Sequence, residues 1–282
     1  MKKILIIVGG GTKHLAPFES AAEGLGVDLT TASFSDISYD SKCDELFVKG
    51  ISLKDFDVVY VRLVGKRLED LLLLLHFTQK YGIRVVEGRI PLRKSLEINT
   101  LSEAKIPVPR TFYGSLAAIK SQAPEIFGYP FVVKSTSGKQ GHEVWSPQNG
   151  EELDNLITKL VSEEKEGKRY LAQEFIRASQ RIRAFVIGER VIGAITRPTR
   201  WRGRFTKRIG QRKVVELSKQ DSDLALSAAK ALGIEVAGVD IIHDDVTGKS
   251  YILEVNSAPR WASIAKDTGV NVEREILKYF LT

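Results

Sequence analysis

The sequence predicts a mixed fold, α/β in its first third and α+β in its C-terminal part. Over the first ninety residues short apolar runs alternate with helical stretches, a pattern typical of a parallel sheet with crossover helices. The middle of the chain is rich in strand-like segments, and a hairpin pattern turning at Gly188 follows it. The 282 residues are enough for two domains or one large one.

The first block, residues 1–90, predicts a parallel sheet of the βαβ kind. Its expected elements alternate: strands at 4–8, 58–63 and 83–86, and helices at 16–24 and 68–80. Three glycines at 9–11 follow the first strand, but the third glycine of the dinucleotide-binding fingerprint is missing. A plain turn between strand and helix explains them.

The rest of the chain mixes strands and helices less regularly. Strands are expected at 131–134, 143–145, 170–176, 181–187, 191–196, 238–242 and 251–255. Helices are expected at 92–105, 116–126, 151–163, 220–232 and 272–281. Pro107 and Pro109 end the first of these helices, because proline cannot continue one.

Composition and charge narrow the function classes. The longest apolar run is five leucines at 71–75, far short of the roughly 20 residues that a membrane span needs. The apolar start at 4–8 is expected to be a strand and not a signal peptide, since glycines interrupt it. Cys43 is the single cysteine, which excludes an internal disulfide and favours a cytoplasmic protein.

The net charge of +7 is concentrated in one segment. Residues 177–213 hold twelve lysines and arginines against one acid, Glu189, so the remainder of the chain is slightly acidic. A local excess of positive charge indicates a site for an anion, such as nucleotide phosphates, an acidic substrate or nucleic acid.

Two acids interrupt apolar strands near the C-terminus. Asp240 lies in 238–242 and Glu254 in 251–255, and a hairpin-length turn between the strands brings the carboxylates together. Asn256 lies on the same face as Glu254, since side chains alternate along a strand. Buried carboxylates need partners, and Mg²⁺ is one that takes oxygen ligands beside substrate phosphates. The alternative is a pair of salt-bridged acids facing the basic segment.

Lys134 ends the apolar strand at 131–134, and a small glycine-containing loop at 135–141 follows it. Such a loop lets backbone N–H groups approach phosphate oxygens. The loop lacks the Gly-Lys-Ser/Thr spacing of a P-loop, and by itself an ordinary hairpin loop explains it equally well.

The motifs taken in order resemble the ATP-grasp ligases, and within them the RimK-type group that includes ribosomal-protein glutamate ligases. They are Lys94, Ile106-Pro107-Val108-Pro109, Phe131-Val132-Val133-Lys134, Gly138-Lys139-Gln140-Gly141, Gln173-Glu174-Phe175-Ile176, Arg183, Gly238-Val239-Asp240 and Glu254-Val255-Asn256. The resemblance covers about residues 89–282. It implies a Rossmann-like pre-ATP-grasp domain at 1–90, a central ATP-grasp subdomain at 91–178 and a C-terminal one at 179–282.

The resemblance also implies roles for individual residues. Lys94 and Lys134 would hold the ATP phosphates, and Arg183 would steady the transferred phosphoryl group, with Lys134 and Arg183 as the catalytic pair. Asp240, Glu254 and Asn256 would bind Mg²⁺ or Mn²⁺. The remaining nucleotide-binding residues would form a flap, Ser137, Gly138, Lys139, Gln140, Gly141 and His142, and an adenine-binding hinge, Gln173, Glu174, Phe175 and Ile176.

The chain departs from the family pattern where the second substrate would lie. Arg181 stands where relatives commonly have an acid, Arg204 where they have Asn, and Arg260 follows Pro259 where they have Gly. Ribose binding or the polarity beside the phosphates is therefore in doubt. The nucleotide half is expected to be intact and the substrate half altered.

The basic residues expected to bind substrate are Arg197, Arg202, Arg204 and Arg260. Arginine forks suit carboxylates, so a glutamate-rich peptide end or a polycarboxylate is the preferred substrate. Nucleic acid stacked on Trp201 and Phe205 is a second possibility, and a solvated basic loop is a third.

The sequence thus predicts a carboxylate–amine ligase that forms an amide or peptide bond through an acyl phosphate, using an amino acid such as glutamate. The alternatives are an ATP-binding regulator or phosphotransferase, and a nucleic-acid binder on the same scaffold. The resemblance further implies a homo-oligomer, a dimer or a tetramer, with no membrane partner.

Overall fold

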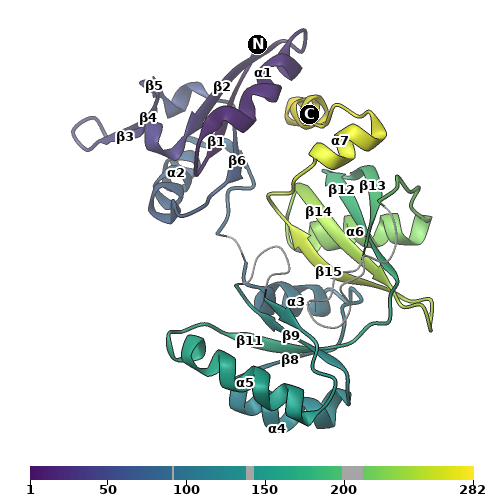
Figure 1. The fold of residues 1–282 in the computed structure, drawn as a ribbon. Helices are drawn as coiled ribbons and strands as arrows, with labels where there is room; N and C mark the ends of the chain where they lie inside the picture. The colour runs from purple at the N-terminus through teal and green to yellow at the C-terminus, as the bar shows by residue number, and fades with distance from the viewer. Residues whose placement is uncertain (91, 138–142, 199–211) are drawn as a thin grey trace.

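The structure of the protein is a computed structural model that describes residues 1–90, 92–137, 143–198 and 212–282. Three four-stranded sheets organise the molecule (Figure 1). The first is parallel and the two that follow are antiparallel, which confirms the predicted change from α/β to α+β along the chain.

The N-terminal sheet has the order β2-β1-β6-β7 with all pairs parallel. Its strands and helices are β1 (Lys2–Val8), β2 (Val27–Ser33), β6 (Val58–Leu63), β7 (Arg84–Val86), α1 (Ala16–Ala22) and α2 (Leu68–Tyr81). Ile6 packs with Phe18 of α1 on one face, while Ile7 packs with Leu71 of α2 on the other. Burial on both faces explains why β1 is apolar from Ile4 to Val8.

Between β2 and β6 the chain forms a small antiparallel sheet that the sequence did not predict. Its strands are β3 (Ile37–Asp40), β4 (Glu45–Val48) and β5 (Ile51–Ser52). Short 3₁₀ helices in this domain are η1 (Thr12–Leu15), η2 (Phe34–Asp36) and η3 (Leu53–Asp55). Only β4 contributes fully buried side chains to this small sheet, Leu46 and Val48, so the apolar signal is weak.

The central sheet has the order β10-β9-β11-β8 and is antiparallel. Its elements are β8 (Thr111–Gly114), β9 (Phe131–Ser135), β10 (Val144–Trp145), β11 (Tyr170–Glu174), α3 (Lys94–Glu103), α4 (Leu116–Phe127) and α5 (Gly150–Lys165). Helices α4 and α5 cover one face (Figure 1), where Val133 and Ala172 are buried. Alternation along the strands places Lys134 and Gln173 on the opposite face.

The C-terminal sheet has the order β13-β12-β14-β15. Its elements are β12 (Gln180–Ile187), β13 (Arg190–Pro198), β14 (Val236–His243), β15 (Ser250–Asn256) and α6 (Lys219–Ala231), followed by α7 (Ala262–Thr268) and α8 (Val272–Leu281). Val239 and Ile241 pack against Ala225 of α6. Asp240, between them, faces the other side of the sheet.

The C-terminal helices return to the N-terminal sheet. The rings of Phe280 and Tyr60 lie 5.2 Å apart, and the two residues share one buried core. Arg62 at the end of β6 donates from Nη2 to the Pro259 carbonyl at 2.6 Å, and its guanidinium lies 4.1 Å from the centre of the Trp261 ring. The predicted domain limits stay a prediction, with the first and last units joined by this core.

None of the helices in the described part of the chain is long and apolar enough to cross a membrane.

Candidate active site

Charged side chains of the central and C-terminal sheets share one electrostatic neighbourhood. Lys134 on β9 belongs to the central sheet, and Glu254 on β15 and Arg181 on β12 belong to the C-terminal one. Besides burial, Lys94 at the start of α3 and Arg181 lower the pKa of Lys134, while Glu254 raises it. The predicted phosphate-binding lysines and the predicted metal-binding strand therefore come together.

Strand register places the predicted metal ligands on one face. Asp240 lies opposite Glu254 on β15 and opposite Arg183 on β12. Asn256 lies opposite Gly238 and shares the face of Glu254. The expected adjacency of the two acids is confirmed, and Arg183 joins them directly.

Asp240 is 1% exposed, and both its carboxylate oxygens accept hydrogen bonds from Arg183. Arg183 Nη2 lies 2.7 Å from Asp240 Oδ2, and Nε donates to Oδ1. Burial lowers the pKa of Arg183, but the Asp240 carboxylate outweighs that effect and the net pKa is raised. A Cβ atom on Gly238 would lie 2.8 Å from Arg183 Nη1, so glycine leaves room for the guanidinium. In this structure Asp240 therefore forms a salt bridge with Arg183, as the alternative interpretation of the two acids predicted.

Glu254 differs from Asp240, because no hydrogen bond or ion pair among the described residues holds its half-buried carboxylate. Asn256 Nδ2 donates to the Gly238 carbonyl at 3.3 Å, which leaves its side-chain oxygen for a ligand. These are hard oxygen donors of the kind that Mg²⁺ prefers. Within the described ranges no group of three or more His, Cys, Asp or Glu side chains could hold a metal.

Lys134 is half-buried and its Nζ donates to Gln173 Oε1 at 2.5 Å. Gln173 Nε2 in turn donates to Thr111 Oγ1 at 2.8 Å. Burial, followed by repulsion from Lys94, lowers the pKa of Lys134 to about 8. A nearby anion would stabilise the charged form of this partly desolvated lysine.

Glu97 belongs to this cluster, although the sequence did not single it out. It is buried on α3, three residues after Lys94, and its Oε1 accepts the Val255 N–H at 2.7 Å. Burial raises the pKa of Glu97 to about 7, and the nearby Glu254 raises it too. An acid one helical turn from a predicted phosphate-binding lysine was the signal available in the sequence.

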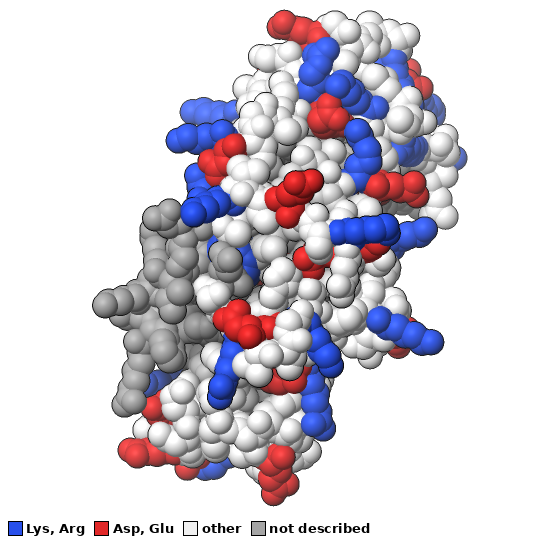
Figure 2. Space-filling model, turned by 90° about the vertical axis from the view of Figure 1, so that its right-hand side faces the viewer, with Lys and Arg blue, Asp and Glu red and all other residues white. Residues whose placement is uncertain are grey.

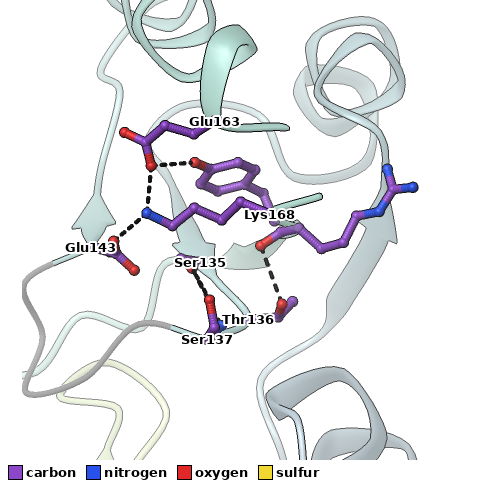
Figure 3. Close-up of polar contacts among 8 residues, drawn as sticks. Ser135, Thr136, Ser137, Glu143, Glu163 and Lys168 are labelled. Carbon is purple, nitrogen blue, oxygen red and sulfur yellow. Dashed lines mark hydrogen bonds and ion pairs between the residues drawn. The ribbon is translucent and has the colours of Figure 1, made fainter. Parts of the chain in front are cut away.

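The predicted flap begins at Ser137, and Gly138, Lys139, Gln140, Gly141 and His142 lie outside the described residues. Both ends of this segment are held by polar contacts (Figure 3). Ser137 and Ser135 are joined through their hydroxyls at 3.3 Å, and Thr136 N–H donates to the Arg169 carbonyl at 2.9 Å. At the far end, Lys168 bonds both Glu143 and Glu163.

The predicted hinge, Gln173 to Ile176, begins in the last two residues of β11. The backbone N–H of Glu174 donates to the Arg110 carbonyl at 2.9 Å, and Glu174 Oε1 accepts the backbone N–H of Arg110 at 2.8 Å. The side chain of Gln173 accepts a hydrogen bond from Lys134. The role of this segment in binding adenine stays a prediction.

The arginines predicted to bind substrate divide into distinct groups. Arg197 is half-buried on β13 and shares the electrostatic neighbourhood of Arg183 and Asp240. Arg260 is exposed beyond Pro259, close to the metal-binding strand in sequence. Arg202 and Arg204, with Trp201 and Phe205, lie outside the described residues.

Comparison with known proteins agrees with this geometry. A model of the RimK-like ATP-grasp domain matches residues 93–280. A probable alpha-L-glutamate ligase of Trichodesmium erythraeum (strain IMS101) is 29% identical over 247 residues, covering 83% of this chain and 80% of the relative. The predicted ligase class agrees with the name of that relative.

Solved structures share the fold over the whole chain. The ATP-grasp ligase PsnB complexed with a minimal precursor has a TM-score of 0.76 at 18% identity, covering 100% of this chain and 99% of that one. A second PsnB structure, complexed with minimal precursor, Mg and ADP, has a TM-score of 0.74 at 18% identity and covers 98% and 97%. The predicted ATP-grasp fold is confirmed, and the chain belongs to the RimK-like ATP-grasp family.

Proposed function

We propose that this protein is an ATP-dependent carboxylate–amine ligase that forms an amide through an acyl phosphate. The observation that carries the proposal is the convergence of Lys134, Arg183 and Glu254 from two sheets on one site. Phosphoryl transfer needs mainly positioning and neutralised charge on the γ-phosphate, and this set supplies both.

The proposed reaction has two steps. An oxygen of the substrate carboxylate attacks the γ-phosphorus of ATP, the bond to the bridging oxygen breaks, and ADP leaves. The amine nitrogen of the second substrate then attacks the acyl carbon, phosphate leaves with the carboxylate oxygen, and the amine loses a proton. Lys94 and Lys134 would bind the phosphates, and Arg183 would balance charge on the phosphoryl group.

Mg²⁺ or Mn²⁺ would be held by Glu254 and Asn256 together with Asp240, and it would neutralise charge on the phosphate oxygens. Glu97 would hold β15 in place through its hydrogen bond with the backbone N–H of Val255. The segment from Ser137 onward would exclude water, because an acyl phosphate exposed to water hydrolyses.

We propose L-glutamate as one substrate and an acidic peptide or polycarboxylate as the other. The names of the sequence relatives and the peptide precursors in the PsnB structures support this choice. On the face in Figure 2, the described lysines and arginines are interspersed with aspartates and glutamates. A cytoplasmic location and a homo-oligomer, dimer or tetramer, complete the proposal.

ADP release tests this function. The protein is incubated with ATP and Mg²⁺ against single amino acids and glutamate-containing peptides, and the products are analysed by mass spectrometry. Substrate-dependent ADP with a product mass equal to two substrates minus water supports the ligase. ADP release that produces a phosphorylated substrate and no amide would favour a phosphotransferase.

A further inference from the structure

Two arginines face each other across the β12–β13 hairpin. Arg181 lies directly opposite Arg197, and Arg183 shares their face two residues along β12. Like charges in directly opposite positions destabilise an antiparallel pair. Sheet stability therefore does not explain why both positions are arginine.

Among the described residues, Asp240 is the carboxylate within ion-pair distance of Arg181 and Arg183. Asp240 bonds Arg183 with both its oxygens, while Arg181 Nη1 lies 3.9 Å from Asp240 Oδ2. Arg181 Nε is buried and has no hydrogen-bond partner among the described residues. In the part of the chain that the structure describes, no carboxylate lies within ion-pair distance of Arg197. Positive charge here exceeds what the protein itself neutralises.

The charges that act on Arg197 are mostly positive. Burial lowers the pKa of Arg197, repulsion from Arg183, Arg181 and Arg212 adds to that effect, and the charge of Asp240 opposes it. On β14 the residue opposite Arg181 is the apolar Ile242, and Lys134 on the facing sheet is a further cation. Lys94 on α3 and Lys134 on β9 are predicted to hold the ATP phosphates, which leaves this arginine pair for a second anion.

We infer that Arg181 and Arg197 form a subsite that binds a carboxylate of the substrate beside Arg183 and Asp240, which makes an acidic compound the substrate of this site. The inference rests on the proposed function for the identity of the reaction. Guanidinium forks bind carboxylates with two parallel hydrogen bonds, and Arg181 Nε supplies an unused donor for such a pair. The subsite adds specificity for acidic side chains to the phosphoryl-transfer site.

The test compares Arg181→Gln and Arg197→Gln with Arg190→Gln. Arg190 lies on the same hairpin but is exposed and paired with Glu275, so it is a matched control. The probes are L-glutamate and tri-L-glutamate, with L-glutamine and tri-L-glutamine as neutral equivalents, in the presence of Mg²⁺ and a non-hydrolysable ATP analogue. Thermal unfolding and calorimetric binding are measured for each protein.

The ligand-free Arg181→Gln protein should unfold at a temperature about 2 °C or more above the wild type, because repulsion is relieved. Its affinity for an acidic probe should fall about tenfold or more, as should that of Arg197→Gln, and this loss should exceed any change in affinity for the ATP analogue. A lower unfolding temperature would make Arg181 a structural partner of Asp240 and overturn the inference.

Acidic probes that fail to bind the wild type, or that bind Arg181→Gln equally well, would also overturn it. ADP release separates this inference from the proposed function. A protein that binds acidic probes through Arg181 but never forms an amide would contradict the ligase and leave the subsite standing. If the protein is an active ligase but Arg181→Gln leaves the KM for an acidic substrate unchanged, the subsite would be contradicted and the ligase would stand.

Discussion

The charge of Lys134 depends on its surroundings. Burial and Lys94 lower its pKa to about 8, so the free protein loses this charge as the pH rises through 8. A bound phosphate favours the charged form and raises the pKa again. ATP binding near pH 8 should therefore take up protons, and affinity should weaken above that pH.

Calorimetry of ATP-analogue binding in two buffers with different ionisation enthalpies measures this proton uptake. Lys134→Arg keeps its charge over the whole range and should remove the dependence near pH 8. Binding without proton uptake at pH 8 would show that Lys134 does not contact the phosphates. In the folded protein alone, the lowered pKa makes stability increase with pH between about 8 and 10.5, because the unfolded chain then binds more protons.

Glu254 tests the metal assignment at the same scale. Its carboxylate has no partner among the described residues, and Glu254→Gln keeps its size while removing its charge. ADP release at saturating Mg²⁺ should fall by about a hundredfold or more, since one strong ligand of the ion is lost. Asn99→Asp, on an exposed part of α3, is a control for altered surface charge. Full activity of Glu254→Gln would exclude this residue as a ligand.

Sequence reasoning found the residues that interrupt apolar strands. Lys134, Asp240 and Glu254 stood out because strand residues around them are buried, and the hairpin between the two acids was correct. Glu97 did not stand out, because helices contain many acids and its contact with Val255 joins positions 158 residues apart. The pairing of Asp240 with Arg183 likewise needs the register of β12 against β14.

At the scale of elements, the residues on both sides of the predicted flap are held by polar contacts. Lys168 bonds Glu143 and Glu163 and so ties the far end to α5 (Figure 3). Lys168→Met should loosen that end, admit water and raise the ADP released per amide formed, measured by paired ADP and product assays.

Arg169→Met is the matched control for Lys168→Met. Arg169 is the adjacent residue, and its exposed side chain pairs only weakly with Glu164, while its backbone carbonyl still accepts from Thr136. In Arg169→Met, the ADP released per amide formed should stay at the wild-type value. An unchanged ratio in Lys168→Met would mean that this ion pair does not control the segment.

Elements with a strong apolar pattern were predicted closely. The strand β6 and the helix α8 have the predicted bounds, and α2 ends one residue later than expected. The strand β2 was not predicted, since most of its side chains are half-buried or exposed at a sheet edge. The strands β3 to β5 and the short helix α7 were missed for the same lack of a periodic buried face.

At the scale of the whole molecule, Glu87 joins the N-terminal sheet to the C-terminal one. Its Oε1 accepts the N–H groups of Glu235 and Val236 at 2.7 and 2.9 Å. Glu87→Ala leaves both without this acceptor and should lower the free energy of unfolding by about 2 kcal/mol. Glu87→Gln keeps a carbonyl acceptor and should cost much less, as measured by denaturant unfolding at pH 7.

The same carboxyl group makes stability depend on pH. Burial raises the pKa of Glu87 to about 7, so between its usual value and 7 the folded protein binds more protons than the unfolded chain. Stability should therefore fall as the pH rises through this window, and Glu87→Gln should show a smaller fall. Equal pH profiles for the two proteins would show that Glu87 titrates normally.

The central claim is that the substrate carboxylate attacks the γ-phosphate, and oxygen transfer tests it most directly. The reaction is run with a substrate whose carboxylate carries ¹⁸O at both oxygens, and the released phosphate is analysed by mass spectrometry. One ¹⁸O atom in each phosphate, formed together with the amide, is the predicted result. Phosphate that carries oxygen only from ATP and water would contradict the acyl phosphate and with it the proposed ligase.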